Sequence, residues 1–472
     1  MDVLAMDTNR NTPSTRKVRR LSSGGKRGPG WKWQREGRRV RRPDPRAITV
    51  REGERNLTNV AGLVAFGQFL RDEGVDAELN ATFGHMKRGP MVVYPMGAQL
   101  RLLMDLHVAG EGRVFVLEAL AHDPLLAKLA GGVLPSIDVL YDDLCRFDAD
   151  ANAVLEGLVA RQGLRELQRR HLDCVHVDID TTVTPMFGNQ EGALLGHNPR
   201  FRGRPSFHPI LARIAETDTI CGALLRPGDH GFGGADVPTV VAWLERVRAT
   251  VGPDCVLHVR IDAAGDCTEL LRALDHLGVV YYIKARITPD LAGAITLQQS
   301  WQTIDSDAMN RPTRQGAPIA FRRAEWDKAE VYPRLVAIRS SERENGKQLY
   351  LWNDLDYTVQ CWLTNNWAIS IDEIAHTYND RAGIEPLIAE LKNGWWIGKA
   401  PSAVFEANHA AFLLKLIAHN LLKRFVLARY PALSKWRTSW SRRVLIQRPG
   451  RIVRSGRSTI VRTTSLVMPM LC

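Results

Sequence analysis

The spacing of apolar residues changes at Cys174, and this change constrains the fold more than any other feature of the chain. From about Leu57 to Leu172, apolar residues recur every three to four positions, which is typical of amphipathic helices. From Cys174 the sequence CVHVDID alternates with a period of two, so Asp178 and Asp180 share one face of a predicted strand. We therefore expect a helical region followed by a region that begins with a strand.

The segments after Cys174 predict the order strand, strand, strand, helix, strand, helix, strand. The predicted strands span 174–180, 208–217, 219–228, 255–262 and 279–287, and the predicted helices span 235–252 and 267–278. This is the order of the ribonuclease H-like fold, in which antiparallel strands precede strands joined by crossover helices. Asp180 on the first strand and Asp262 at the end of the fourth lie where that fold keeps its metal-binding acids.

The predicted fold class is α/β: a ribonuclease H-like catalytic domain that is interrupted by a β-rich insertion and preceded by an N-terminal helical domain. The expected segments are 1–46, a basic and disordered tail; 47–172, a helical DNA-binding domain; 173–287, the first part of the ribonuclease H-like domain; 288–368, the β-rich insertion; 369–430, the C-terminal helices of the ribonuclease H-like domain; and 431–472, a basic tail. Strands of the insertion are expected at 318–326, 333–341, 347–354 and 356–364, and short β-like pieces of the last segment at 442–447 and 458–464.

Three carboxylates from separate segments, Asp180, Asp262 and Glu385, are what a protein needs to hold two Mg²⁺ ions. Mg²⁺ favours oxygen ligands and keeps positions open for water and phosphate. Two such ions can activate a water molecule and stabilise the leaving oxygen in phosphodiester cleavage. We expect Mn²⁺ to be able to replace Mg²⁺. A helix that carries Glu385 and Lys392 could hold a metal ion while it contacts the DNA backbone.

Three other acids remain alternatives to these ligands. They are Asp178, which shares the strand face of Asp180; Asp266, which follows Asp262 beyond the strand end; and Glu390, which lies five residues after Glu385 and about 140° away around a helix.

Pro386 indicates where the helix that carries Glu385 begins. Proline is tolerated only in the first turn of a helix. The helix is therefore expected to start near Ile384, with Gly383 marking a break. Lys392, seven residues after Glu385, then still lies on the same face of that helix.

Charge is distributed unevenly along the chain. Residues 1–46 carry a net charge of +10, and residues 407–472 carry 13 Lys and Arg but no Asp or Glu. Because the whole chain has a net charge of +12, residues 47–406 carry −11. Basic ends around an acidic centre favour a polyanionic partner, such as DNA, that meets a cation-dependent site.

The cysteines and the apolar runs exclude several other classes of protein. Seven cysteines occur without a Cys-x-x-Cys pair, which argues against a disulfide framework and a zinc site and favours a reducing cytoplasm. Residues 1–30 contain no apolar core of signal-peptide type. The most apolar run, 410–428, is interrupted by charged residues, so we expect a helix within a globular body and no membrane partner.

At residues 378–392 the sequence YNDRAGIEPLIAELK resembles that of a known group, the DDE transposases of bacterial insertion sequences with a Tyr-x2-Arg-x3-Glu-x6-Lys signature. Tyr378, Arg381, Glu385 and Lys392 match that spacing at all four positions. Asp-Thr-Thr at 180–182 resembles the first acidic motif of the group, and NPRFRGRPSFHPILA at 198–212 resembles the segment that follows it in one branch. The similarity covers roughly residues 57–422.

The resemblance implies a metal-dependent enzyme that recognises the terminal inverted repeats of its mobile element, nicks the DNA and joins the freed 3′-OH to a target DNA. By the same resemblance, Asp180, Asp262 and Glu385 are catalytic and bind two metal ions. Tyr378, Arg381 and Lys392 are the implied DNA-binding residues: Arg381 and Lys392 contact phosphates near the transposon end, and Tyr378 packs or hydrogen-bonds beside them. A homodimer on paired ends is implied, as is action at the nucleoid in the bacterial cytoplasm.

The second acidic motif departs from the pattern of this group. It is IDAAGDC, whereas the branch that the chain resembles usually has Asp-Ser-Gly-Phe. Ala263 and Ala264 leave Asp262 in place but alter its loop. An alternative function is therefore that of a catalytically inactive DNA-binding protein on a transposase scaffold. A third is a nuclease without strand transfer.

Overall fold

The computed structural model describes residues 53–196, 198, 201–341 and 357–464. Every helix and strand described below lies within one compact unit, Asn56–Cys472. The predicted basic tail at 1–46 and the predicted strand at 347–354 lie outside the described residues.

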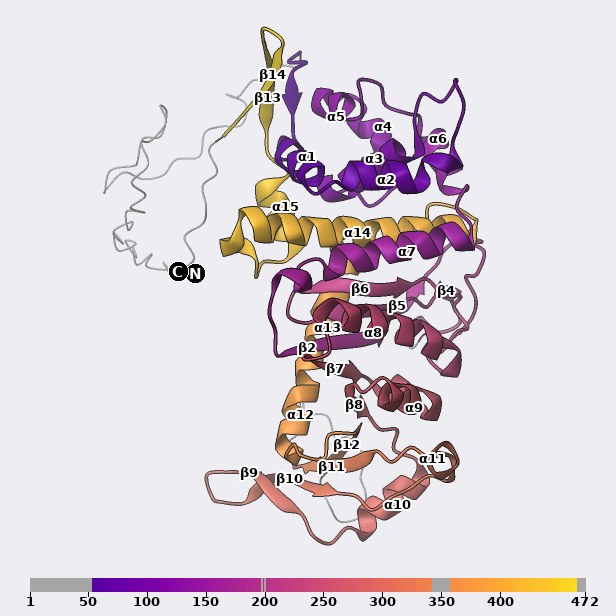
Figure 1. The fold of residues 1–472 in the computed structure, drawn as a ribbon, viewed down its shortest axis with the longest axis vertical. Coiled ribbons are helices and arrows are strands. Elements are labelled where there is room, and N and C mark those ends of the chain that lie inside the picture. Colours follow the sequence, from indigo (N-terminus) through magenta and orange to yellow (C-terminus); the bar gives the residue numbers. More distant parts are fainter. Residues whose placement is uncertain (1–52, 197, 199–200, 342–356, 465–472) are drawn as a thin grey trace, which may run out of the picture. The chain divides into compact units, whose positions relative to one another are not determined.

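Helices fill the chain between Leu57 and Leu172. They are α1 (Leu63–Asp72), α2 (Val75–Phe83), α3 (Met96–Ala109), α4 (Leu117–Leu120), α5 (Pro124–Leu129), α6 (Ile137–Leu144) and α7 (Ala149–Leu164). Asp123, Ser136 and Asp148 cap the starts of α5, α6 and α7, because each side chain accepts a hydrogen bond from a backbone amide of the first turn. Both α3 and α7 pack against the long helix α14 (Phe405–Arg429), which Figure 1 shows between the helices and the sheet.

A nine-stranded sheet forms the other side of this core, in the order β6-β5-β2-β7-β8-β12-β11-β10-β9. The strands of its first half are β2 (Cys174–Thr181), β5 (Ile210–Ile214), β6 (Thr219–Leu224), β7 (Val256–Ile261) and β8 (Val280–Lys284). β2 pairs with β5 in antiparallel and with β7 in parallel orientation, and β7 pairs with β8 in parallel. These elements follow the order predicted from the sequence.

Two crossover helices connect the parallel strands. α8 (Val237–Val251) lies between β6 and β7, and α9 (Thr268–His276) lies between β7 and β8. Trp243 of α8 is 1% exposed and packs so closely on Gly222 of β6 that a Cβ there would lie 2.2 Å from the indole. Glycine is therefore required at this point of the strand, because the backbone and the ring approach each other directly.

The second half of the sheet comes from residues 288–368. Its strands are β9 (Gln302–Ser306), β10 (Pro312–Pro318), β11 (Arg334–Ser340) and β12 (Thr358–Thr364), and it also contains α10 (Pro289–Leu297) and α11 (Ala324–Ala329). β12 pairs with β8, so these strands widen the sheet instead of forming a separate one. The predicted strand at 318–326 is wrong, because β10 ends at Pro318 and α11 begins at Ala324.

The C-terminal part of the chain returns to helix. Its elements are α12 (Ile371–Asn379), a 3₁₀ turn η8 (Asp380–Gly383), α13 (Ile384–Gly394), α14, α15 (Thr438–Leu445) and the hairpin β13 (Gly450–Ser455) and β14 (Ser458–Thr463). β13 also pairs with β1 (Leu57–Thr58).

The predicted β-like piece at 442–447 is wrong, because most of it lies in α15. Leu445 and Ile446 are buried there, and the carbonyl oxygen of Leu445 would lie 1.8 Å from a Cβ at Gly62. This tight packing against α1 overrides the β propensity of the Val-Leu-Ile run.

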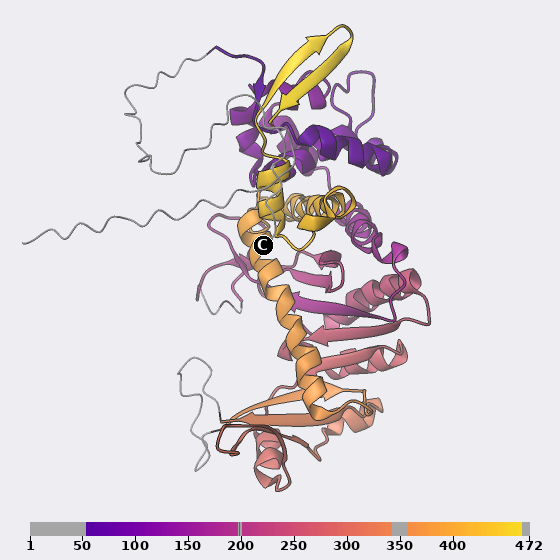
Figure 2. The ribbon, with the colours of Figure 1, turned by 90° about the vertical axis from the view of Figure 1, so that its left-hand side faces the viewer.

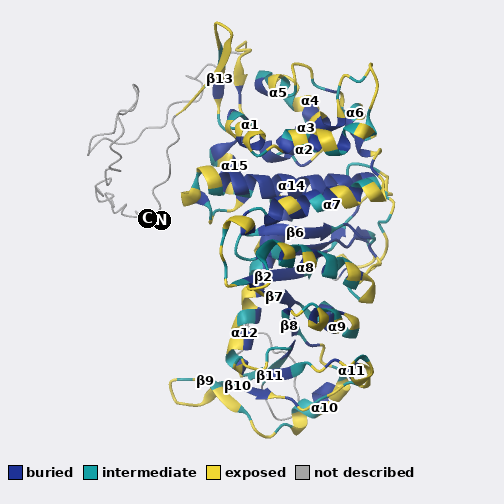
Figure 3. Cartoon of the chain, viewed as in Figure 1, coloured by how far each residue is buried: buried dark blue, intermediate teal, exposed yellow. Residues whose placement is uncertain are grey.

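The middle of α14 is buried on all sides, as Figure 3 shows. Asn420 illustrates how its polar groups are satisfied: the side chain accepts a hydrogen bond from the amide of Ile220 at 2.9 Å and donates to the carbonyl of Ile220 at 2.8 Å. Among the residues that the structure describes, no helix is both long and apolar enough to cross a membrane.

Candidate active site

The three predicted acids come from three elements that meet at one edge of the sheet. Asp180 lies near the end of β2, and Asp262 directly follows β7, whose Ile261 is paired in parallel with Ile179 of β2. Glu385 lies in the first turn of α13, which packs against β2. In Figure 2 the orange helices α12 and α13 run across the strands. The carboxyl ends of two neighbouring parallel strands and the start of a helix therefore bring these side chains together.

The charge of Asp180 depends on all of its neighbours. Burial and the like charges of Asp262 and Glu385, opposed by the Arg381 guanidinium, together raise the pKa of its carboxyl group to about 6. Nη2 of Arg381 lies 3.1 Å from Oδ2 of Asp180, and the backbone amide of Thr181 donates to Oδ1 at 2.8 Å. The three acids are thus close enough to influence one another electrostatically.

Two of the signature residues, Tyr378 and Arg381, are buried next to Asp180. Arg381 is 7% exposed, and its guanidinium carbon lies 6.0 Å from the centre of the Tyr378 ring. Tyr378 packs against Trp362 of β12, and burial raises the pKa of its hydroxyl group to about 12. Nε of Arg381 is buried without a hydrogen-bond partner among the described residues.

Lys392 lies two turns along α13 from Glu385. Its amino group donates to the carbonyl oxygen of Val183 at 2.9 Å and so holds the segment that follows Asp180. Glu385 itself is exposed. The helix starts at Ile384 with Pro386 in its first turn, as predicted.

Each of the three alternative acids accepts hydrogen bonds from residues of other elements of the fold. Asp178 is fully buried and accepts hydrogen bonds from Nε of Arg260 at 2.6 Å and Nη1 of Arg213 at 2.9 Å. Asp266 accepts from Nη1 of Arg323 at 2.6 Å, and Glu390 accepts from Thr438 and from the amide of Ser439. Asp178 and Asp266 are thus bound to arginine side chains and Glu390 to the start of α15, so each of the three acids has a structural role.

Sequence reasoning missed Arg260 and Arg213, which connect the sheet to the segment that carries the signature. Nη1 of Arg260 donates to the carbonyl oxygen of Thr377 in α12 at 2.9 Å. Nη1 of Arg213 would lie 2.7 Å from a Cβ at Gly383, so the guanidinium packs against the turn that precedes Glu385. The period of two in the strand 255–262 could have identified Arg260, because it places Arg260 and Asp262 on the same face.

The chemistry of the donor set fits a hard divalent cation. Carboxylate oxygens are the ligands that Mg²⁺ prefers. A cation would also relieve the repulsion that Asp262 and Glu385 exert on Asp180. In the described part of the chain, no group of three or more His, Cys, Asp or Glu side chains is arranged to hold a metal ion, and Arg381 is the positive charge that balances Asp180.

Residues 41–469 match the family model described as transposase DDE domain group 1. No curated protein matches the chain. Among solved structures, the piggyBac transposase in a synaptic complex with hairpin DNA is similar over 83% of this chain and 81% of that chain, with 11% sequence identity and a TM-score of 0.42.

Proposed function

The chain belongs to the DDE transposase family, and from this premise we propose that it binds the ends of its mobile element and catalyses metal-dependent DNA strand cleavage and strand transfer. The observation that carries the proposal is the meeting of Asp180, Asp262 and Glu385 at one sheet edge, where burial and then the charges of the other two acids raise the pKa of Asp180. Three coupled carboxylates beside a buried arginine are a site for cations and phosphate rather than for an apolar substrate.

We propose that the catalytic part of the chain has the ribonuclease H-like fold. The order β6-β5-β2-β7-β8, with β5 antiparallel to β2 and with β7 and β8 parallel to each other, supports this assignment. The proposed division keeps the catalytic domain at 173–287 and 369–430, with 288–368 as the insertion and 47–172 as a helical DNA-binding domain.

Asp180, Asp262 and Glu385 would hold two divalent ions, Mg²⁺ or in its place Mn²⁺. Such ions, when bound, supply an activated water and charge stabilisation at the leaving oxygen. Tyr378 holds Arg381 against Asp180, and Lys392 fixes the segment after Asp180 through Val183. We assign phosphate contacts to Arg381 and Lys392; the unpartnered Nε of Arg381 supports the first assignment.

The altered loop after Asp262 is compatible with activity. The Asp262 carboxylate accepts a hydrogen bond from the amide of Ala264 at 3.0 Å and so caps the 3₁₀ turn over Ala263–Gly265. Gly265 packs on Ile261, where a Cβ would lie 2.5 Å from the isoleucine side chain. The turn therefore holds Asp262 at the strand end without the serine of the related motif.

The proposed partners are the terminal inverted repeats, the target DNA and a second copy of this chain on paired ends, at the nucleoid of a bacterial cytoplasm. The basic C-terminal residues 407–472, which contain no Asp or Glu, support a polyanionic partner.

A cleavage assay tests the proposed reaction. Duplex DNA that carries the element's own end is incubated with Mg²⁺ and either the wild type or Glu385→Ala. We expect cleavage to fall by at least about a hundredfold in the variant, since loss of one ligand disrupts the two-metal site, while DNA binding persists. Binding without cleavage by both proteins would contradict the proposal and favour the inactive DNA-binding scaffold. Cleavage without joining would favour a nuclease.

A further inference from the structure

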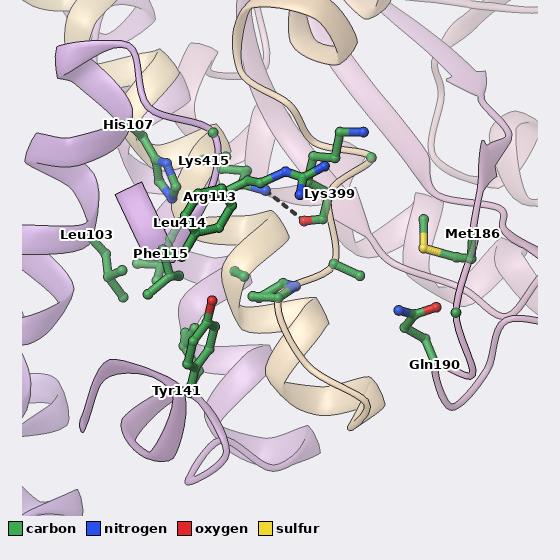
Figure 4. A pocket seen from close by; sticks show the side chains of 18 of the residues that line it. Leu103, His107, Arg113, Phe115, Tyr141, Met186, Gln190, Lys399, Leu414 and Lys415 are labelled. Atoms are coloured by element: carbon green, nitrogen blue, oxygen red, sulfur yellow. Dashed lines mark hydrogen bonds between the residues drawn. The ribbon is translucent and has the colours of Figure 1, made fainter. Parts of the chain in front are cut away.

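A pocket of about 360 Å³ lies where the helical region, the segment after β2 and the start of α14 meet. Its walls come from α3 and the turn at 112–115, from α6, from residues 185–190, from the connection 398–401 and from α14. Its size is within the range of sites that bind small molecules. Figure 4 shows Leu103, His107 and Phe115 on one side and Met186 and Gln190 on the other.

The pocket is cationic. Arg113, Lys399 and Lys415 line it, and none of the residues that line it is acidic. Lys415 is 2% exposed, and its amino group donates to the carbonyl oxygens of Trp396 and Lys399, each at 2.9 Å. Burial, and then the charges of Lys399 and Arg113, lower the pKa of Lys415 to about 7, so the cationic groups face a common space. An anion in the pocket would relieve that repulsion.

The remaining walls are aromatic or apolar. Tyr141 is half-buried in the pocket, whereas Phe115 and Phe187 are 47% and 76% exposed at its rim. The Arg204 guanidinium lies 4.3 Å from the centre of the Phe187 ring and adds a further cation beside the rim. Aromatic faces accept any stacked base, and cations beside them accept the phosphate of the same nucleotide.

The pocket shares two chain segments with the candidate active site. The segment after Asp180 is held by Lys392 at Val183 and continues to Met186 in the pocket wall. The connection that follows the signature helix runs from Trp395 to Lys399, and a Cβ at Gly398 would lie 3.4 Å from the Thr184 side chain. A DNA strand bound at the three carboxylates would therefore extend along these two segments toward the pocket.

We propose that this pocket binds one nucleotide of a DNA strand, with the base against Tyr141 and Phe115 and the phosphate at Arg113 and Lys399. The proposal rests on DNA as the substrate and adds a site for an extrahelical or single-stranded nucleotide outside the three carboxylates. Extrusion of a nucleotide from a duplex costs stacking energy, which a pocket of this kind offsets.

Photocrosslinking tests where the nucleotide lies. A single-stranded oligonucleotide that contains 5-iododeoxyuridine is irradiated with the full chain in the absence of divalent metal, and the crosslinked peptides are identified by mass spectrometry. We expect crosslinks to the peptides that contain Tyr141 and Phe115. Crosslinks confined to other parts of the chain, such as 431–464, would overturn the proposal.

Fluorescence anisotropy with the same oligonucleotide tests the cationic contacts. For Arg113→Ala with Lys399→Ala, we expect affinity to fall by about tenfold at moderate salt and the log–log salt slope to drop by about 1.4, as for two phosphate contacts on a single strand. Arg272→Ala with Lys328→Ala, two exposed cations on α9 and α11, is the matched control and should leave both unchanged. An unchanged slope in the pocket variant would overturn the proposal, provided that its melting temperature equals that of the wild type.

Tyr141→Leu separates a nucleotide site from a simple anion site. We expect about fivefold weaker oligonucleotide binding, because a stacking face is lost, and unchanged competition by pyrophosphate. Equal losses for both ligands would contradict the base contact. None of these measurements needs cleavage, so failure of the catalytic proposal and failure of this one are distinguishable.

Discussion

Lys415 carries its amino group into the interior of the protein on α14, where the backbone carbonyl oxygens of Trp396 and Lys399 receive its hydrogen bonds. Its pKa is lowered to about 7, whereas its ordinary value is 10.5. Between these two pH values the unfolded chain keeps a proton that the folded chain has released. Folding stability linked to Lys415 therefore rises as the pH rises from 7 toward 10.5, and the full cost of burying the charge applies below pH 7.

The variant Lys415→Met removes this titration and keeps the apolar stem. We expect the wild type to gain roughly 1–3 kcal/mol of this contribution between pH 7 and pH 9, at about 1.4 kcal/mol per pH unit, and the variant to lose that gain. Melting temperatures measured across pH 7–9 report the difference. Lys128→Met, at an exposed site on α5, should melt with the pH dependence of the wild type. Parallel curves for wild type and Lys415→Met would refute the prediction.

At the scale of single residues, the positions of charged side chains were only partly predictable. The alternation in 174–180 places Asp178 and Asp180 on one face. It does not indicate that two arginines donate hydrogen bonds to the Asp178 carboxylate. Those arginines come from strands far apart in sequence, so only the sheet register brings them to Asp178. The same applies to Arg381, whose contact with Asp180 joins residues 201 positions apart.

At the scale of elements, the ion pairs of Asp178 connect three strands to the helix that carries Tyr378. Arg260 of β7 contacts Asp178 of β2 and donates to Thr377 of α12, while Arg213 of β5 reaches Asp178 and Gly383. The position of the turn before Glu385 is therefore determined by the sheet as well as by the helices.

The variant Arg260→Met should weaken the connection between the sheet and α12. It leaves the Asp178 carboxylate with one partner, and loss of a partner from a buried ion pair costs about 3–5 kcal/mol. We expect a lower melting temperature and at least about tenfold slower DNA cleavage, because Tyr378 and Glu385 lose their fixed positions. DNA-binding affinity should change little. Arg272→Met, on the exposed face of α9, is the control; if its cleavage rate fell equally, the ion-pair explanation would fail.

Regular elements with one buried face were predicted well, and elements whose packing partner is distant in sequence were not. The strands around β2 and the start of α13 follow from alternation and from Pro386. By contrast, 442–447 has the composition of a strand but becomes helical where it packs on Gly62. No local pattern indicates that contact, because tertiary packing routinely overrides weak propensities.

At the scale of the whole molecule, charge is segregated between the acidic middle of the chain and its basic C-terminal residues. The hairpin β13–β14, yellow in Figure 1, presents the exposed arginines Arg454, Arg457 and Arg462. It is attached through β1 to the helical region. A DNA duplex at the candidate active site needs cationic surface beyond the carboxylates, which by themselves repel phosphate.

We therefore expect the hairpin to supply phosphate contacts without sequence readout. Substitution of its three arginines by glutamine should reduce the log–log salt slope of duplex binding by about 2.7, since each contact contributes about 0.9. The loss should be equal for an element end and for unrelated DNA, because backbone contacts carry no sequence information. The control variant has glutamine at Arg272, Arg322 and Lys328, three exposed cations in the acidic middle of the chain. It should leave the salt slope of duplex binding unchanged. If both triple variants lowered the slope equally, binding would reflect net charge alone rather than a located surface.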